Sequence, residues 1–499
     1  MTTAIDRGAP APEKQDQGRR GSHALRWWVL AVLGVAQLMV VLDATVVNIA
    51  LPAAQQDLGF SDGDRSWVVT GYALAFGGLL LLGGRLSDLF GRRNTFIVGL
   101  IGFAVASAIG GAATSFEMLV AARVGQGVFG ALLAPAALSL LTVTFTEPSE
   151  RAKAFGIFGA IAGAGGALGL LLGGALTEWA SWRWVMFVNL AFAAVALVGA
   201  VLLLAKHVSE QRPKLDIPGT IVVTAALFGI VYGFSHAEST SWTNGVTLGF
   251  LIGGVVLLGL FGWLETRVAN PLLPLRIITD RMRGASYLTV FVMGIGMFAI
   301  FLFLTYYMQL VMGYSPIMTG VAFLPMIAAL VLTSTTVPSL LLPKIGPKAV
   351  VSGGFVIAAA GMAWLTQIGL TTGYNTHVLP ALILLGLGLG ASMSTAFQGA
   401  TSGVQHEDAG VASAMVNTSQ QVGGSIGTAL LSTIAASAAG DYLSSRTPDP
   451  VTVAQASIES YTTSFWWATA IFVAGAAITA VLMPSTVPAP AEGEPVLAH

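Results

Sequence analysis

Two ionisable residues stand inside long apolar runs of this chain, and their types define the chemistry that it could perform. Asp43 lies in the run from residue 26 to residue 51, and Arg123 lies in the run from 117 to 142. A charged side chain at the centre of a bilayer costs at least about 2.5 kcal/mol, so it normally faces a protein interior and has a function. Asp43 can gain and lose a proton, whereas arginine stays charged in proteins. We predict that Asp43 is the proton-carrying group of a multi-helix exporter.

Asp43 and Arg123 are expected to be partners, either directly or through water. Of the 24 acidic residues, Asp43 alone lies well inside a predicted span, and the others fall in tails, loops or helix ends. Burial disfavours the ionised carboxylate and a nearby arginine favours it, so a conformational change that alters their distance or hydration would alter proton affinity. A ligand that favours deprotonated Asp43 is then disfavoured by the proton, which is the minimum requirement for exchange. The alternative is a static pair that fixes two helices against each other.

The composition predicts an all-α polytopic membrane protein. The chain has 499 residues, of which 55% are hydrophobic and 9% are charged. Ordinary soluble domains carry about 25% charged residues. There are no cysteines, which excludes disulfides, thiolate metal sites and cysteine nucleophiles. Because the sequence contains neither a P-loop nor a cluster of His, Asp and Glu within the membrane, we expect no ATP motor, no metal, no cofactor and no enzyme or receptor site.

Fourteen apolar runs are long enough to span a bilayer as helices. They lie near residues 27–50, 66–86, 95–114, 117–142, 154–177, 183–205, 217–236, 246–265, 285–310, 318–341, 349–370, 378–401, 410–437 and 462–483. Alternate connecting segments, beginning with the N-terminal tail, hold 19 of the 23 lysines and arginines, and the opposite segments hold three. Basic loops stay in the cytoplasm, so we predict a multi-pass protein of the cell membrane with both termini cytoplasmic.

A weak internal repeat indicates two halves. Residues 84–93 and residues 339–348 close two loops of the same predicted side, 255 positions apart, and Gly91 matches Gly346. Transporters with parallel repeats are built in this way. The predicted division is a disordered cytoplasmic tail at 1–25, a six-helix bundle at 26–205, a linker with two additional transmembrane helices at 206–283, a second six-helix bundle at 284–483 and a cytoplasmic tail at 484–499.

The first of these loops carries the most specific motif of the chain. It reads Gly84-Arg-Leu-Ser-Asp88-Leu-Phe-Gly91-Arg92-Arg93 and resembles the signature between the second and third helices of the major facilitator superfamily. The glycine at position 91 permits a tight turn, the aspartate can accept hydrogen bonds near a helix start, and the arginines hold the loop at an anionic membrane face. The resemblance implies a gating loop; the simpler alternative is that the arginines only set topology.

Three further stretches resemble the fourteen-helix drug:proton antiporters of that superfamily. They are Leu42-Asp43-Ala-Thr-Val-Val-Asn48-Ile-Ala-Leu-Pro52, then Trp182-Arg-Trp with Phe187 and Asn189, and the stretch from Asp408 to Gly424. Arg123 stands in a run that resembles the superfamily's fourth-helix motif. The resemblance implies a major facilitator fold with two six-helix bundles plus two extra helices. It also implies efflux of amphipathic, often cationic or aromatic compounds in exchange for protons.

Glycines crowd the fifth predicted span. Gly165, Gly169 and Gly173 are four residues apart, so one helical face has no side chains and another helix can approach closely. In the antiporter family this span holds a signature of Gly-Pro with paired glycines, to which Gly174 also corresponds, but Leu170 stands at the proline position. Generic membrane packing is the alternative explanation of these glycines.

Several polar or aromatic residues at membrane depth are candidates for substrate contacts, although each could instead form a helix–helix hydrogen bond. They are Asn48, Tyr72, Gln126, Tyr306, Gln309, Gln398, Asn417 and Gln420. The expected partners are a small amphipathic substrate, protons and the lipid bilayer, with no nucleic acid, and we expect a monomer. The proton gradient is the expected energy source. The alternative within transport is a metabolite facilitator or importer of the same fold without proton antiport.

Overall fold

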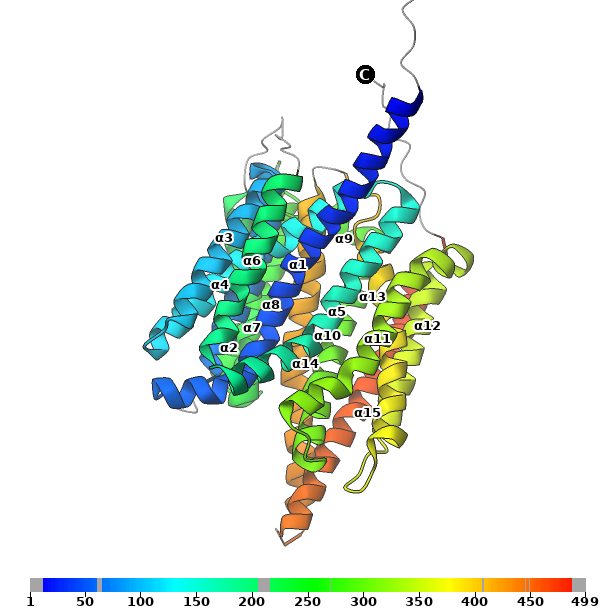
Figure 1. Ribbon diagram of the computed structural model, residues 1–499. Helices are drawn as coiled ribbons and strands as arrows, with labels where there is room; N and C mark the ends of the chain where they lie inside the picture. The colour runs from blue at the N-terminus through cyan, green and yellow to red at the C-terminus, as the bar shows by residue number, and fades with distance from the viewer. Residues whose placement is uncertain are drawn as a thin grey trace, which may run out of the picture.

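The chain folds into a bundle of long helices that run roughly side by side (Figure 1). The computed structural model describes residues 12–60, 65–204, 216–269, 271–405, 408–444, 446–447 and 449–486, and every regular element in these ranges is a helix. The first helix, α1, begins at Pro12, inside the region predicted to be a disordered tail. The helix therefore starts before the predicted span, whereas its apolar part, from Leu25 to Val47, agrees with that span.

The helices of the first part of the chain are α1 (Pro12–Leu58), α2 (Arg65–Phe90), α3 (Arg92–Gly111), α4 (Phe116–Thr144), α5 (Pro148–Trp179), α6 (Arg183–Leu203), α7 (Ile217–Ser239) and α8 (Gly245–Glu265). The second part contains α9 (Leu275–Thr279), α10 (Arg281–Ala299), η1 (Ile300–Leu304), η2 (Tyr307–Val311), α11 (Pro316–Leu340), α12 (Leu342–Leu365), η3 (Tyr374–Val378), α13 (Leu379–Ala400), α14 (Ala409–Ser444) and α15 (Pro450–Leu482).

Many of these helices begin where the sequence supplies a capping side chain. Ser115, Asp216, Asp280, Ser315 and Asp449 each accept a hydrogen bond from a backbone N–H of the first turn that follows. Such a cap satisfies one of the four amide groups that a helix start leaves without a partner. Polar residues between apolar runs therefore set the helix boundaries.

Thirteen helical segments among the described residues are long and apolar enough to cross a membrane. They correspond to thirteen of the fourteen predicted spans, and the remaining prediction, 154–177, falls within the 32-residue helix α5. Side chains of α5 at 163, 164, 167 and 170 lie outside the described residues. The ninth predicted span, 285–310, is not one regular helix, because α10 continues through two π-helical segments, η1 and η2.

The helices form two groups, one from each part of the chain, and the two groups pack against each other. In the first group α4 packs against α2 and α3, and α1 packs against α5 and α6; in the second, α13 packs against α11 and α12, and α10 packs against α14. The groups meet mainly where α5 lies on α11 and α2 lies on α14. The hairpin α7–α8 packs against α2 and α14 through α7.

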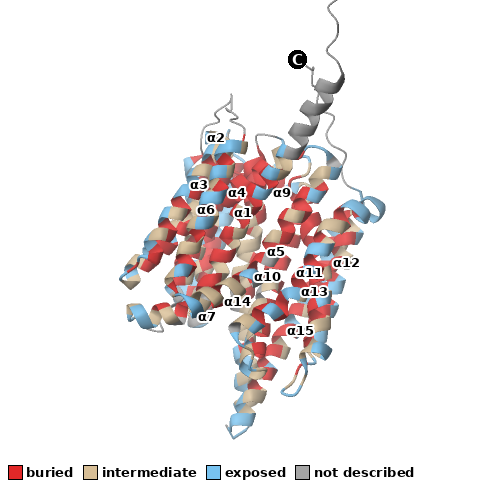
Figure 2. Ribbon diagram, in the orientation of Figure 1, coloured by how far each residue is buried: buried red, intermediate tan, exposed pale blue. Residues whose placement is uncertain are grey.

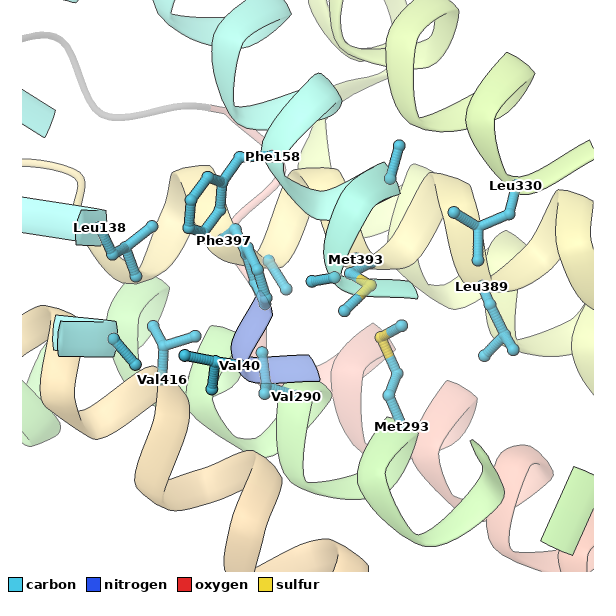
Figure 3. Close-up of a cluster of buried hydrophobic side chains, with 14 of the residues drawn as sticks. Val40, Leu138, Phe158, Val290, Met293, Leu330, Leu389, Met393, Phe397 and Val416 are labelled. Atoms are coloured by element: carbon cyan, nitrogen blue, oxygen red, sulfur yellow. The ribbon is translucent and has the colours of Figure 1, made fainter. Parts of the chain in front are cut away.

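The buried residues lie between the helices, and exposed residues lie on the outer faces of the bundle (Figure 2). The central part of the core is apolar and draws on both groups of helices (Figure 3). It contains Val40 of α1, Phe158 of α5, Met293 of α10 and Met393 of α13. Against this apolar interior, a buried charged network is an exception that calls for an explanation.

Candidate functional site

Asp43 on α1 and Arg123 on α4 form a direct ion pair in the interior. Nη1 of Arg123 lies 2.5 Å from Oδ2 of Asp43, and each residue is 1% exposed. The partnership predicted from charge balance is therefore a direct contact. A buried pair of this kind needs further hydrogen bonds to offset the cost of removing both charges from water.

The second oxygen of Asp43 accepts two amide donors. Nε2 of Gln126 lies 2.8 Å and Nδ2 of Asn189 lies 2.7 Å from Oδ1. Gln126 follows Arg123 by three residues, so both side chains project from one face of α4, and Asn189 approaches from α6. Three donors on two oxygens are the arrangement that stabilises an ionised carboxylate.

Ser107 of α3 supports both amides. Its Oγ lies 2.8 Å from Nε2 of Gln126 and 3.4 Å from Nδ2 of Asn189, and the residue is fully buried. Ser107 was not predicted, because a serine in an apolar helix has no distinguishing pattern. Asn189 was predicted only as part of a family signature. Both residues belong to the site through tertiary contact.

Arg123 has acceptors other than Asp43. Its Nε donates to the backbone oxygen of Val68 on α2 at 3.2 Å, and its Nη1 also donates to Oε1 of Gln126 at 2.8 Å. Its guanidinium carbon lies 4.4 Å from the ring centre of Tyr72, which is cation–π distance. If Asp43 became protonated, Arg123 would keep these contacts and would not become an isolated buried charge. The geometry thus gives Arg123 acceptors that do not depend on the charge of Asp43.

The predicted glycine stripe of α5 lies against α1, close to Asp43. A Cβ at Gly165 would come within 2.6 Å of Val41, one at Gly169 would collide with Oγ1 of Thr45, and one at Gly173 would lie 3.1 Å from Val46. Gly174 is also buried. These glycines let α5 approach the helix that carries the carboxylate.

The predicted gating loop joins the two groups of helices. Oδ1 of Asp88, near the end of α2, accepts the backbone N–H of Gly410 at the start of α14 at 3.2 Å. The helices touch there, since a Cβ at Gly84 would lie 2.6 Å from the carbonyl oxygen of Gly410. Arg92 lies 3.7 Å from Oδ1 of Asp88, and Arg93 donates to the carbonyl of Val201 at the end of α6.

The loop and its predicted repeat share a backbone feature. Gly91 has φ +88° and Gly346, its match in the second half, has φ +77°. A positive φ is costly for residues with a Cβ, which explains glycine at both turns. The contacts differ, because Gly346 packs against the carbonyl of Ser485 and the position of Asp88 is taken by Pro343.

A second polar contact between the two groups was not predicted. Nη2 of Arg151, at the start of α5, donates to the carbonyl of Thr401 at 2.9 Å and lies 3.1 Å from its hydroxyl. Thr401 directly follows α13. Together with the contact between Asp88 and Gly410, this bond holds the two groups together at the end of the bundle where α2 and α13 end.

Two predicted substrate contacts belong instead to the ion-pair network. Tyr72 is 5% exposed and lies on Arg123, and Gln126 is fully buried between Asp43 and Ser107. In this conformation neither can touch a ligand without breaking the network. The side chain of Asn48 lies outside the described residues.

The other five candidates are spread over the region of η1 and η2, α13 and α14. Tyr306 is 45% exposed and Gln309 is partly exposed, beside the π-helical segments. Gln398 is partly buried, and its Oε1 has no hydrogen-bond partner among the described residues. Asn417 donates to the carbonyl four residues earlier, and Gln420 is partly exposed. Their roles as substrate contacts stay predictions.

Burial also extends to acids that the sequence places at helix ends. Asp216, Glu265 and Asp408 are 5%, 5% and 4% exposed. Asp408 pairs with Arg276 at 2.5 Å, whereas no arginine or lysine among the described residues bonds the other two. Position along a helix was therefore a poor guide to burial for these three residues.

Comparisons with known proteins agree with this architecture. Residues 33–428 match the family model described as Major Facilitator Superfamily. The puromycin resistance protein pur8 of Streptomyces alboniger is 47% identical over 468 residues, which cover 93% of each chain. The cephamycin export protein CmcT of Amycolatopsis lactamdurans is 36% identical over 425 residues, covering 84% of this chain and 87% of that protein.

Two further matches extend the comparison. The tetracenomycin C resistance and export protein of Streptomyces glaucescens is 36% identical over 422 residues, covering 84% of this chain and 78% of that protein. The crystal structure of the human organic anion transporter MFSD10 superposes with a TM-score of 0.62 over 90% of this chain and 99% of that chain. At 14% identity, the superposition concerns the fold alone.

Proposed function

The chain belongs to the major facilitator superfamily and is a transporter rather than an enzyme, and from this premise we propose that it exports amphipathic antibiotics or specialised metabolites in exchange for protons. The names of the relatives support this substrate class, because they refer to puromycin resistance, cephamycin export and tetracenomycin C resistance and export. We further propose that it acts as a monomer in the cell membrane with both termini in the cytoplasm.

The ion pair of Asp43 and Arg123 is the observation that carries the proton-coupling part of the proposal. A fixed buried pair is often no more stabilising than apolar packing, so stability alone does not account for it. Asp43 is the group that can change charge, and Arg123 has other acceptors at hand when it does. Proton uptake on Asp43 would weaken its bonds to Arg123, Gln126 and Asn189, which come from α4 and α6.

The position of the contacts between the two groups of helices supports alternating access. For a site between the two groups to open toward the end where α2 and α13 end, the bonds from Asp88 to Gly410 and from Arg151 to Thr401 must break. Asp43 is sealed from solvent in the present conformation, so proton exchange also requires a different arrangement of the helices. One conformational change would thus expose both the substrate path and the proton site.

The deciding experiment is uptake of a fluorescent substrate into everted membrane vesicles that carry a pH gradient. We expect wild-type uptake to collapse with an uncoupler, and we expect Asp43→Asn to lose gradient-driven uptake while inserting normally. Asp57→Asn is the matched control, because Asp57 lies on the same helix but forms an exposed pair with Arg183. Its uptake should equal that of the wild type.

Two outcomes would count against the proposal. Full gradient-driven uptake by Asp43→Asn would show that another group carries the proton. Uptake by the wild type that ignores uncouplers would indicate a facilitator of the same fold.

A further inference from the structure

Two buried carboxylates meet at the end of the additional hairpin, far from Asp43 in the sequence. Asp216 caps the start of α7, and Glu265 is the last residue of α8. Each residue is 5% exposed. They lie together because α7 and α8 are antiparallel neighbours, which places the start of one beside the end of the other.

Each carboxylate uses one oxygen and leaves the other free. Oδ1 of Asp216 accepts the backbone N–H of Gly219 at 2.9 Å, and Oε2 of Glu265 accepts the backbone N–H of Leu273 at 2.9 Å. Oδ2 of Asp216 and Oε1 of Glu265 are buried and have no hydrogen-bond donor among the described residues. A buried carboxylate oxygen without a donor is costly.

The two free oxygens point to the same place. A Cβ on Gly219 would collide with Oδ2 of Asp216 and would lie 2.9 Å from Oε1 of Glu265. Both oxygens therefore crowd the one side of Gly219 where a side chain would stand. The missing side chain leaves the space in which the two carboxyl groups approach each other.

The described basic residues of the segments that follow α8 are engaged elsewhere, whereas positions 205–215, before Asp216, lie outside the described residues. The guanidinium of Arg267, after α8, lies 5.4 Å from the ring centre of Trp263. On α9, Arg276 pairs with Asp408 of the α14 start. No cation in these contacts offsets the two carboxylates.

Among the described residues, no charged group of α10 or α2 bonds Asp216 or Glu265 either, although the buried Nε of Arg85 has no hydrogen-bond partner of its own. Arg283 donates to backbone carbonyls at 276, 277 and 402. On α2, Arg85 lies within electrostatic range of Asp88, which bonds Gly410. Two ionised carboxylates side by side without a cation repel each other, and the favourable solution is that one of them keeps a proton.

We propose that Asp216 and Glu265 hold one proton between them and that this proton fastens the α7–α8 hairpin to the segment 271–274. One carboxyl group donates the proton to the free oxygen of the other, which satisfies both orphan oxygens with a single hydrogen bond. Uptake changes the charge of the pair from −2 to −1, and the proton is taken from the solvent at that end of the bundle. This is a proton-binding site separate from Asp43.

The consequence is a latch next to the bond from Asp88 to Gly410, which joins the two groups of helices. Residues 271–274 lead directly into α9 and α10, and α7 packs on α2 and α14, whose ends carry the bond from Asp88 to Gly410. With the proton bound, Glu265 holds the N–H of Leu273 against the hairpin. When the pH rises and the proton leaves, repulsion separates the carboxylates and releases this segment.

The absence of cysteine in the sequence permits a direct test with two spin labels. Ile221→Cys on α7 and Thr279→Cys at the end of α9 place the labels at exposed positions on either side of the latch. Double electron–electron resonance would follow their separation from about pH 5 to about pH 9, the range in which buried carboxyl groups titrate. We expect a longer separation at high pH.

Substitutions then identify the groups that cause the pH-dependent change in label separation. Glu265→Gln keeps a donor toward Asp216 and should hold the short separation at every pH, and Asp216→Asn should do the same. Glu178→Gln, at an exposed position of α5, should titrate as the wild type does. Asp43→Asn should also keep the transition, so this proposal and the proposed transport mechanism can fail separately.

Infrared spectroscopy supplies an independent readout. The wild type at low pH should show the carbonyl band of a protonated carboxyl group that is lost in Glu265→Gln and retained in Asp43→Asn. An unchanged transition in Glu265→Gln would overturn the proposal. It would also be overturned by a separation that responds to sodium or magnesium at fixed pH, since the site would then hold a metal cation.

Discussion

The two buried acid sites differ in how they are balanced. Asp43 faces an arginine and two amides, so each of its oxygens has a donor. Asp216 and Glu265 face each other with one free oxygen apiece and no cation among the described residues. The first site is complete with an ionised carboxylate, whereas the second is complete only when it contains a proton.

This difference predicts how each site should respond to protonation. At the first site the proton competes with the guanidinium of Arg123, so protonation must loosen bonds that link α1 to α4 and α6. At the second site the proton creates a bond, so protonation must tighten the hairpin. Variants that remove the counter-charge, a single donor or the space between the acids separate these two behaviours.

Removing the counter-charge should have the largest effect. Arg123→Ala leaves Asp43 buried without its cation, and breaking a buried pair in this way costs about 3–5 kcal/mol. We expect a lower thermal unfolding midpoint in detergent and loss of gradient-driven uptake. Arg123→Lys keeps the charge and should recover part of both. An unchanged pH profile of uptake in Arg123→Ala would show that the pair has no part in coupling.

Removing one donor from Asp43 should have an intermediate effect. In Asn189→Ala the ionised carboxylate loses an amide hydrogen bond, and bonds to charged groups contribute about 1.5–3 kcal/mol. The unfolding midpoint in detergent should therefore fall by less than in Arg123→Ala, and gradient-driven uptake should decrease but persist.

A second variant tests whether this shift is specific. Asn417→Ala removes an amide that, among the described residues, bonds only a carbonyl of its own helix, and its unfolding midpoint should match that of the wild type. An unchanged unfolding midpoint in Asn189→Ala would show that its amide does not stabilise the site.

Much of the first site could be predicted from the sequence, because its charges interrupt apolar runs. Asp43 and Arg123 are conspicuous where charge is costly, and the spans that carry them are long and apolar. Family resemblance added Asp88 and Gly91 of the gating loop. The chain matches the superfamily in sequence and in fold, as that resemblance implied.

The remainder depends on contacts that no local pattern encodes. Ser107 is one serine in an apolar helix, and the acceptor from Val68 is a backbone atom. Asp216 and Glu265 stand before the first helix and at the end of the second helix of a hairpin, and each alone resembles an ordinary solvated helix end. Their burial depends on tertiary contacts, among them the bond from the N–H of Leu273 to Glu265.

Filling the space between the two acids should destabilise the second site alone. Gly219→Ala places a methyl group against Oδ2 of Asp216, and overpacking of this kind costs about 1–3 kcal/mol. Gly249→Ala is the matched control in the same hairpin, because a Cβ there meets no atom within 4 Å. Hydrogen exchange at Leu273 should accelerate in Gly219→Ala and not in Gly249→Ala. Equal exchange in both variants would show that the carboxylates do not hold this segment.

The smallest effect is expected at an acid that is paired but exposed. Asp57 lies 2.8 Å from Arg183 and accepts the indole N–H of Trp182 at 3.0 Å, with 49% of its side chain exposed. Exposed pairs contribute about 0.2–1 kcal/mol, because water screens the charges and the side chains lose freedom when they pair. Asp57→Asn should therefore shift the unfolding midpoint slightly, and high salt should reduce that difference further. A loss as large as that of Arg123→Ala would mean that burial is not what distinguishes the Asp43 site, and the contrast between the acids would have to rest on their partners alone.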